Sequence, residues 1–123
     1  MNNNTSPNQP LIHWKNGQPP QPPYYANVFN YLLGDDLAGY DEMDAKTLEL
    51  VWNVDGFLGY ESHKSSGRGS FISYWRDLEA INQWRHNPIH QQAKSLGQKK
   101  WYKYYHSMLV LVQTHHYHSF SSL

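Results

Sequence analysis

Cysteine is absent from the chain, which excludes disulfide bonds, thiolate nucleophiles and thiolate-bound zinc or iron–sulfur centres. No run of about 20 apolar residues occurs, so no membrane partner is expected. The amino terminus lacks a charged start followed by an apolar run, so we expect no secretory signal and a cytoplasmic location. Excess positive charge is also missing: ten basic residues balance ten acidic ones, which argues against a nucleic acid as partner.

Aromatic residues are abundant instead. They make up 15% of the 123 residues, as five tryptophans, ten tyrosines and four phenylalanines. A chain of this length is expected to form one domain with a modest core. Because that core is too small to hide so many rings, some of them are predicted to line a pocket or a subunit interface.

The two ends of the chain differ in composition from its middle. Residues 1–23 hold six of the seven prolines and many Asn and Gln, which predicts an extended, disordered tail. Residues 115–123 are expected to form a second, polar tail. The folded domain is therefore predicted to span residues 24–114.

Four segments carry the first part of the secondary-structure prediction. Helical spacing of apolar residues and acids in the first turn predict a helix over Asp41–Val54. Aromatic and branched residues bounded by turn signals predict three strands, at Tyr24–Leu33, Phe57–His63 and Ser70–Arg76, the last two joined as a hairpin.

A second helix is predicted to begin after Asp77 and to break at Asn87-Pro88, where proline can start a new helical segment with Asn87 as its cap. Gly97 is predicted to end it, and Met108–Val112 forms the last strand. The order βαββαβ predicts an α+β, ferredoxin-like fold with a four-stranded antiparallel sheet and two helices on one face. The other face would expose apolar side chains, so a partner or a ligand must cover it.

A set of residues from the second strand onward resembles a known family. The set comprises Gly56–Tyr60, Tyr74-Trp75, Ala80, Ile81, Trp84, His86–His90, Ala93, Gly97, Trp101 and Tyr105. It is similar to the antibiotic biosynthesis monooxygenase-like domains, over residues Tyr24–Thr114. The resemblance implies a dimeric α/β barrel, in which the sheet faces of two identical subunits pack together and cover one another.

That family includes cofactor-free oxygenases of aromatic polyketides, haem-degrading monooxygenases and members without an assigned activity. The resemblance therefore implies a cofactor-independent monooxygenase for a small aromatic, polyketide- or quinol-like substrate. The haem-degrading members use a tryptophan on the third strand, which Trp75 matches, and a histidine ligand on the second helix, whose place falls on Lys94. Because a protonated amine is a poor axial ligand, no cofactor is expected, and haem is kept as the alternative.

Cofactor-free oxygenation requires a base, a dry cavity and donors to a developing oxyanion. The predicted catalytic residues follow from these needs: His90 as base or proton shuttle, Asn27 to orient the substrate oxygen and Trp75 as a cavity wall. The predicted substrate-binding residues are Tyr25, Phe29 and Trp84. Tyr25 and Phe29 share one strand face with Asn27, because side chains alternate with period two.

No metal site is predicted. His86 and His90 have the four-residue spacing that places two imidazoles on one helix face, but Pro88 lies between them.

Two other functions are open at this point. One is a non-enzymatic ligand-binding or regulatory dimer of the same fold. The other is an RNA recognition motif, which has the same element order and to which Arg68–Tyr74 bears a partial likeness. That segment is one residue short of the motif, and a slip of one residue moves the stacking rings to the opposite sheet face.

Overall fold

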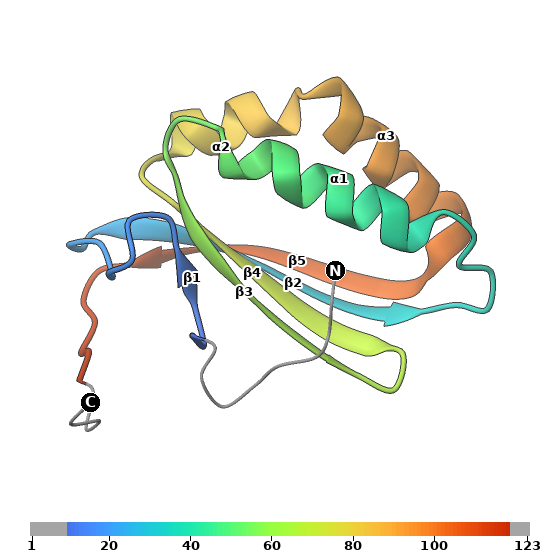
Figure 1. Cartoon of the computed structure of the whole chain (residues 1–123), viewed down its shortest axis with the longest axis horizontal. Helices are drawn as coiled ribbons and strands as arrows, with labels where there is room; N and C mark the ends of the chain where they lie inside the picture. The colour runs from blue at the N-terminus through green and yellow to red at the C-terminus, as the bar shows by residue number, and fades with distance from the viewer. Residues whose placement is uncertain (1–9, 119–123) are drawn as a thin grey trace.

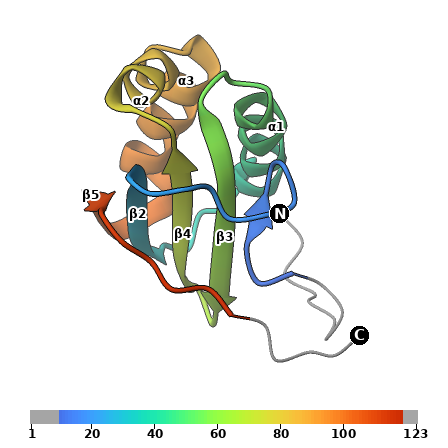
Figure 2. The ribbon, with the colours of Figure 1, turned by 90° about the vertical axis from the view of Figure 1, so that its left-hand side faces the viewer.

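Three helices lie on one face of a five-stranded antiparallel sheet in the computed structural model, which describes residues 10–118 (Figures 1 and 2). The strand order across the sheet is β1-β3-β4-β2-β5. The strands are β1 His13–Trp14, β2 Tyr24–Leu33, β3 Phe57–Ser65, β4 Arg68–Trp75 and β5 Tyr102–Val112. The helices are α1 Tyr40–Trp52, α2 Leu78–Arg85 and α3 Pro88–Leu96, followed by the π-helix η1 Gly97–Trp101. The α+β, ferredoxin-like fold class is confirmed, whereas the prediction of four strands is wrong.

The additional strand, β1, comes from the segment that was expected to be a disordered tail. His13 pairs with Tyr60 and Trp14 with Gly59 at the edge of β3. An edge strand offers unpaired backbone groups, and the Trp14 ring also finds aromatic partners in Tyr24 and Tyr74. Residues 1–9 and 119–123 of the two predicted tails lie outside the described residues.

The helix starts follow local capping. The Asp77 carboxylate accepts a hydrogen bond from the Ala80 backbone N–H at 2.9 Å and begins α2. The Asn87 side chain accepts from Ile89 and His90, with Pro88 at the first position of α3. The predicted break between two helical segments is confirmed, so the sheet is covered by three helices where two were predicted.

The last strand is longer than predicted. Gly97 is the C-cap of α3, as predicted, but its backbone angles are helical and the chain continues into η1, so that β5 begins at Tyr102. The run from Tyr102 to Tyr105, expected to be a connection, pairs with β2 in the sheet. Glycine is required at position 97 because a Cβ there would lie 2.6 Å from the Tyr102 ring.

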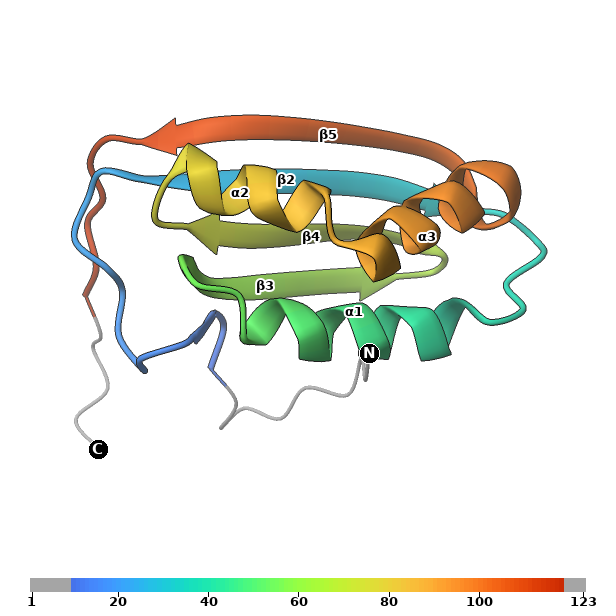
Figure 3. The same ribbon diagram turned by 90° about the horizontal axis from the view of Figure 1, so that it is seen from above.

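The buried core occupies one end of the space between sheet and helices. Its buried members are Val51, Phe57, Trp75, Ala80, Ile81 and Trp84. Seen from above, α2 and α3 lie over β4 and β2, while β5 forms the uncovered edge (Figure 3). No helix within residues 10–118 is both long and apolar enough to cross a membrane.

Candidate functional site

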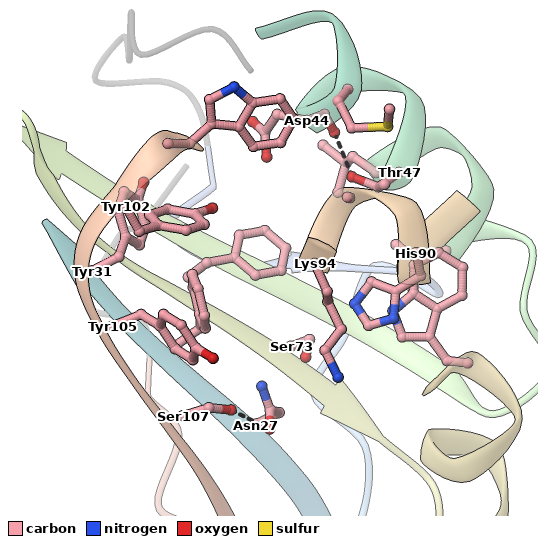
Figure 4. A pocket seen from close by; sticks show the side chains of 18 of the residues that line it. Asn27, Tyr31, Asp44, Thr47, Ser73, His90, Lys94, Tyr102, Tyr105 and Ser107 are labelled. Atoms are coloured by element: carbon pink, nitrogen blue, oxygen red, sulfur yellow. Dashed lines mark hydrogen bonds between the residues drawn. The ribbon is translucent and has the colours of Figure 1, made fainter. Parts of the chain in front are cut away.

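A cavity of about 480 Å³ lies between the sheet and the helices (Figure 4). Its floor comes from β2, β4 and β5 with one residue of β3, and its walls come from α1, α2, α3 and η1. Helix α1 contributes a stripe at helical spacing that includes Tyr40, Asp44, Thr47 and Val51. The volume is that of a small-molecule site, and the lining combines rings with a few polar groups.

His90 is the most perturbed titratable group at the α3 side of this cavity. Its ring stacks on Trp84 with centroids 4.7 Å apart, and its buried Nδ1 has no hydrogen-bond partner within the described residues. Burial lowers the pKa of His90 to about 4, assisted by the positive charges of Lys94 and Arg85 and opposed by a hydrogen bond to the Trp84 backbone. The imidazole is therefore neutral at pH 7 and can accept a proton.

Lys94 and Asn27 supply donors near this imidazole. Lys94 lies four residues after His90 on α3, and its side chain extends towards the sheet (Figure 4). The Asn27 side-chain oxygen accepts a hydrogen bond from Ser107 at 3.3 Å, which leaves the amide NH₂ directed at the cavity (Figure 4). An ammonium and an amide near a neutral base can stabilise an anion that forms when the base removes a proton.

Trp75 lines the cavity but lies mainly in the core. It is 1% exposed, and its ring packs edge-on against Phe57. The indole N–H donates to the Ser73 hydroxyl at 2.9 Å, so it is occupied within the protein. The geometry thus makes Trp75 a wall whose polar group faces its own strand.

The six residues selected from the sequence do not all meet in the cavity. Asn27, Phe29, Trp75, Trp84 and His90 line it together. Tyr25 is on the same face of β2 as Asn27, but it packs against the core cluster and is not part of the lining.

A second cluster in the cavity was not foreseen as a site. It consists of Tyr31, Tyr40, Asp44, Lys64 and Tyr102. Burial raises the pKa of each of these three tyrosines, and the neighbouring Asp44 carboxylate raises them further. Asp44 and Lys64 form an ion pair at 3.5 Å. Tyr40 and Asp44 have the i, i+4 spacing of one helix face, which was the one signal in the sequence.

The histidine pair does not converge. His86 follows the last residue of α2, is exposed, and its Nδ1 contacts the Asn82 carbonyl at 2.8 Å, whereas His90 turns into the cavity. Between residues 10 and 118, no group of three His, Cys, Asp or Glu side chains could hold a metal ion.

The cavity residues also fit haem poorly. Axial ligation requires a ring nitrogen with a free lone pair, and the stacking of His90 on Trp84, at an interplanar angle of 22°, leaves the Nδ1 lone pair in the plane of the ring. The place of the family's histidine ligand is taken by Lys94, which carries no imidazole. The residues present therefore lack an imidazole at the position of the family's axial ligand.

Comparison with known proteins places this chain in a family. The family model described as antibiotic biosynthesis monooxygenase matches residues 41–96. The uncharacterized protein YqjZ of Bacillus subtilis is 42% identical over 87 residues, which is 70% of this chain and 76% of that protein.

Two solved structures share the fold at low sequence identity. Protein SO0527 from Shewanella oneidensis has a TM-score of 0.64 at 14% identity, covering 72% of this chain and 90% of that one. SnoaB from Streptomyces nogalater, a cofactor-independent oxygenase, has a TM-score of 0.61 at 13% identity, covering 78% of this chain and 97% of that one. The identity and coverage of YqjZ, the family match and these folds agree: this chain belongs to the antibiotic biosynthesis monooxygenase family.

Proposed function

We propose that the protein is a cofactor-independent monooxygenase whose substrate is a small aromatic compound of the anthrone or hydroquinone type. The observation that carries the proposal is a neutral, desolvated imidazole with an unpartnered nitrogen in an aromatic cavity. The fold shared with SnoaB, a cofactor-independent oxygenase, supports it. A base of this kind is the group that such a reaction needs first.

The reaction balances with O₂ as the only co-reactant. With an anthrone, His90 removes a ring C–H proton, and the carbanion passes one electron to O₂. The resulting radical and superoxide combine into a peroxide, which takes the proton back from the imidazolium. Loss of water from the hydroperoxide leaves a ketone, so one oxygen atom enters the substrate and the other leaves as water.

The low pKa of His90 suits this cycle in one respect and limits it in another. The imidazole is uncharged at pH 7, but with a pKa of about 4 it is a weak base. The substrate anion forms beside the new imidazolium, and the Lys94 ammonium and the Asn27 amide lie at the same side of the cavity. Their attraction for the anion offsets the weakness of the base. Phe29 and Trp84 keep water away from the carbanion.

A homodimer completes the proposed protein. The sheet face opposite the helices carries the apolar residues Val28, Ile72, Met108 and Val110. On this face Met108 is 36% exposed and Val110 is 38% exposed. A second copy would cover this face. Light scattering should give a dimer for the native chain and a monomer for Met108→Glu. Leu109→Glu, on the other face of the same strand and 42% exposed, is the control that should remain dimeric. A native monomer at micromolar concentration would overturn the dimer.

Oxygen uptake tests the activity. The purified protein is incubated with a panel of anthrones and hydroquinones, with and without air, and ¹⁸O₂ incorporation is followed by mass spectrometry. The proposal requires one labelled oxygen per product and at least a hundredfold loss of rate in His90→Gln. His86→Gln, at an exposed position in the same helical region, should retain the rate.

Binding without turnover is the result that would refute the enzyme. If the panel binds but no member consumes oxygen, the protein is a ligand-binding dimer of the same fold. An activity unchanged in His90→Gln would refute the role of the imidazole.

A further inference from the structure

The two ends of the cavity differ in charge. At the α3 end, Lys94 and Arg85 lie near His90, and their positive charges lower its pKa. At the other end, Tyr31 and Tyr102 lie across the cavity from His90, with Asp44 above them (Figure 4). One end therefore favours an anion, whereas the other presents hydroxyl groups and a carboxylate.

The tyrosine end is a connected set of polar groups. The Tyr40 hydroxyl hydrogen-bonds with those of Tyr31 and Tyr102. Asp44 pairs with Lys64, whose side chain is 11% exposed and whose ammonium lies 5.4 Å from the centre of the Tyr40 ring. Because Asp44 neutralises this enclosed lysine, the cluster carries no surplus positive charge with which to bind an anion.

Two glycines give these rings their space. A Cβ at Gly69, which pairs with Tyr31 in the sheet, would collide with the Tyr31 hydroxyl. A Cβ at Gly97 would lie 2.6 Å from the Tyr102 ring. The Trp101 indole, held by a 3.0 Å hydrogen bond to the Ala38 carbonyl, packs edge-on against Tyr40. The hydroxyls are thus held in place before any ligand arrives.

We propose that the tyrosine cluster is a second polar subsite, which accepts a neutral hydroxyl or keto group and rejects a carboxylate. The ligand then binds in one direction, with its acidic group at the Lys94 end and a neutral oxygen at the tyrosine end. The role of this binding direction in turnover rests on the proposed function, because the direction presents the acidic position of the substrate to His90. The substrate class narrows to aromatic compounds with an acidic position at one end, a neutral oxygen at the other end and at most one negative charge.

Three ligands that differ at one position test the subsite. They are 2-naphthoate, 6-hydroxy-2-naphthoate and naphthalene-2,6-dicarboxylate, and their affinities are measured by calorimetry. Each has a carboxylate for the Lys94 end. A hydrogen bond at the far end should make the hydroxy compound about fivefold tighter than 2-naphthoate. A second carboxylate buried without a cationic partner should bind at least about tenfold more weakly than the hydroxy compound.

Asp44→Asn supplies the charge change. It leaves the Lys64 ammonium without its carboxylate, so the dicarboxylate should gain at least about tenfold relative to the hydroxy compound. Tyr102→Phe keeps the ring and removes one hydroxyl, so the fivefold preference for the hydroxy compound should fall below about twofold. If Asp44→Asn fails to fold, Tyr102→Phe alone tests whether the tyrosine cluster binds the hydroxyl group.

The readout separates the subsite from the chemistry. Absence of oxygen uptake together with the expected selectivity rejects the oxygenase and supports the subsite. In His90→Gln the three affinities should shift together, because that residue lies at the shared carboxylate end. The subsite is overturned if native protein binds the dicarboxylate as tightly as the hydroxy compound, if no ligand binds, or if neither Asp44→Asn nor Tyr102→Phe moves the ratios.

Discussion

Replacing His90 by glutamine removes a partly buried imidazole whose pKa, about 4, lies far below the value of 6.5 for a free histidine side chain. Between these two pH values the unfolded chain binds a proton that the folded chain does not bind. The folded protein is thus at its most stable, as far as this group is concerned, above pH 6.5, and it loses stability as the pH falls towards 4. Glutamine does not titrate, so the His90→Gln variant does not lose stability at low pH through this position.

The size of the effect follows from the two pKa values of His90. One pKa unit corresponds to about 1.4 kcal/mol, so the full shift amounts to about 3.4 kcal/mol at low pH. At pH 5 the proton is bound in most unfolded chains and in few folded ones, and the loss relative to pH 8 is about 2 kcal/mol. The free energy of unfolding of the native protein minus that of His90→Gln should therefore fall by about 2 kcal/mol from pH 8 to pH 5.

Urea unfolding followed by tryptophan fluorescence measures this difference. The protein concentration is kept the same throughout, because association of two copies would also change the apparent stability. His86→Gln, at an exposed position next to the same helix break, controls for the general loss of a histidine. A native-minus-variant difference that changes by less than about 0.5 kcal/mol between the two pH values would refute the burial argument for His90.

Three further predictions concern the cavity and its glycine contacts. Lys94→Met should raise the pKa of His90, because it removes a nearby positive charge, and NMR titration of the ring would show no rise if that charge does not reach the imidazole. Haem titration should give no saturating shift of the Soret band, since Lys94 stands at the position of the family's histidine ligand; a stoichiometric shift that His90→Ala abolishes would contradict this. Gly69→Ala should lower the free energy of unfolding by about 2 kcal/mol through its clash with the Tyr31 hydroxyl. Tyr31→Leu, which removes the hydroxyl and also the ring carbon that the added Cβ would meet, should recover part of that loss in the double variant, and simple additivity of the two changes would count against the clash.

Short-range signals predicted the elements well. Asp77 and Asn87 cap helices as expected, because a capping side chain needs only the N–H groups of the next turn. Where pairing between distant segments decides whether a strand forms and where it begins, the local sequence pattern did not predict the strand correctly. The aromatic run after Gly97 had no clear period, and its first strand residue, Tyr102, is fixed by pairing with Leu33. Strand β1 has only two residues, which is too few for a periodic strand pattern in the sequence. It forms because these residues pair with the free edge of β3.

The cavity was predictable only in part for the same reason. Alternation along β2 placed Tyr25, Asn27 and Phe29 on one face, and this is correct. The pattern could not tell that helices cover that face, or that Tyr25 lies where the core fills the space. Oxygenase chemistry remains a prediction from these positions.

The sequence alone determined the absence of thiol chemistry, the fold class and the resemblance to a monooxygenase family, since these depend on composition, local hydrogen bonding and residue order. Only the tertiary structure decided the polarity of the cavity. Tyr40 and Asp44 come from a helix, Lys64 and Tyr102 from strands that are not neighbours in the sheet, and His90 from another helix. Burial in one shared space shifts the pKa values of His90, Tyr40 and Tyr102, and such burial depends on side chains far apart along the chain.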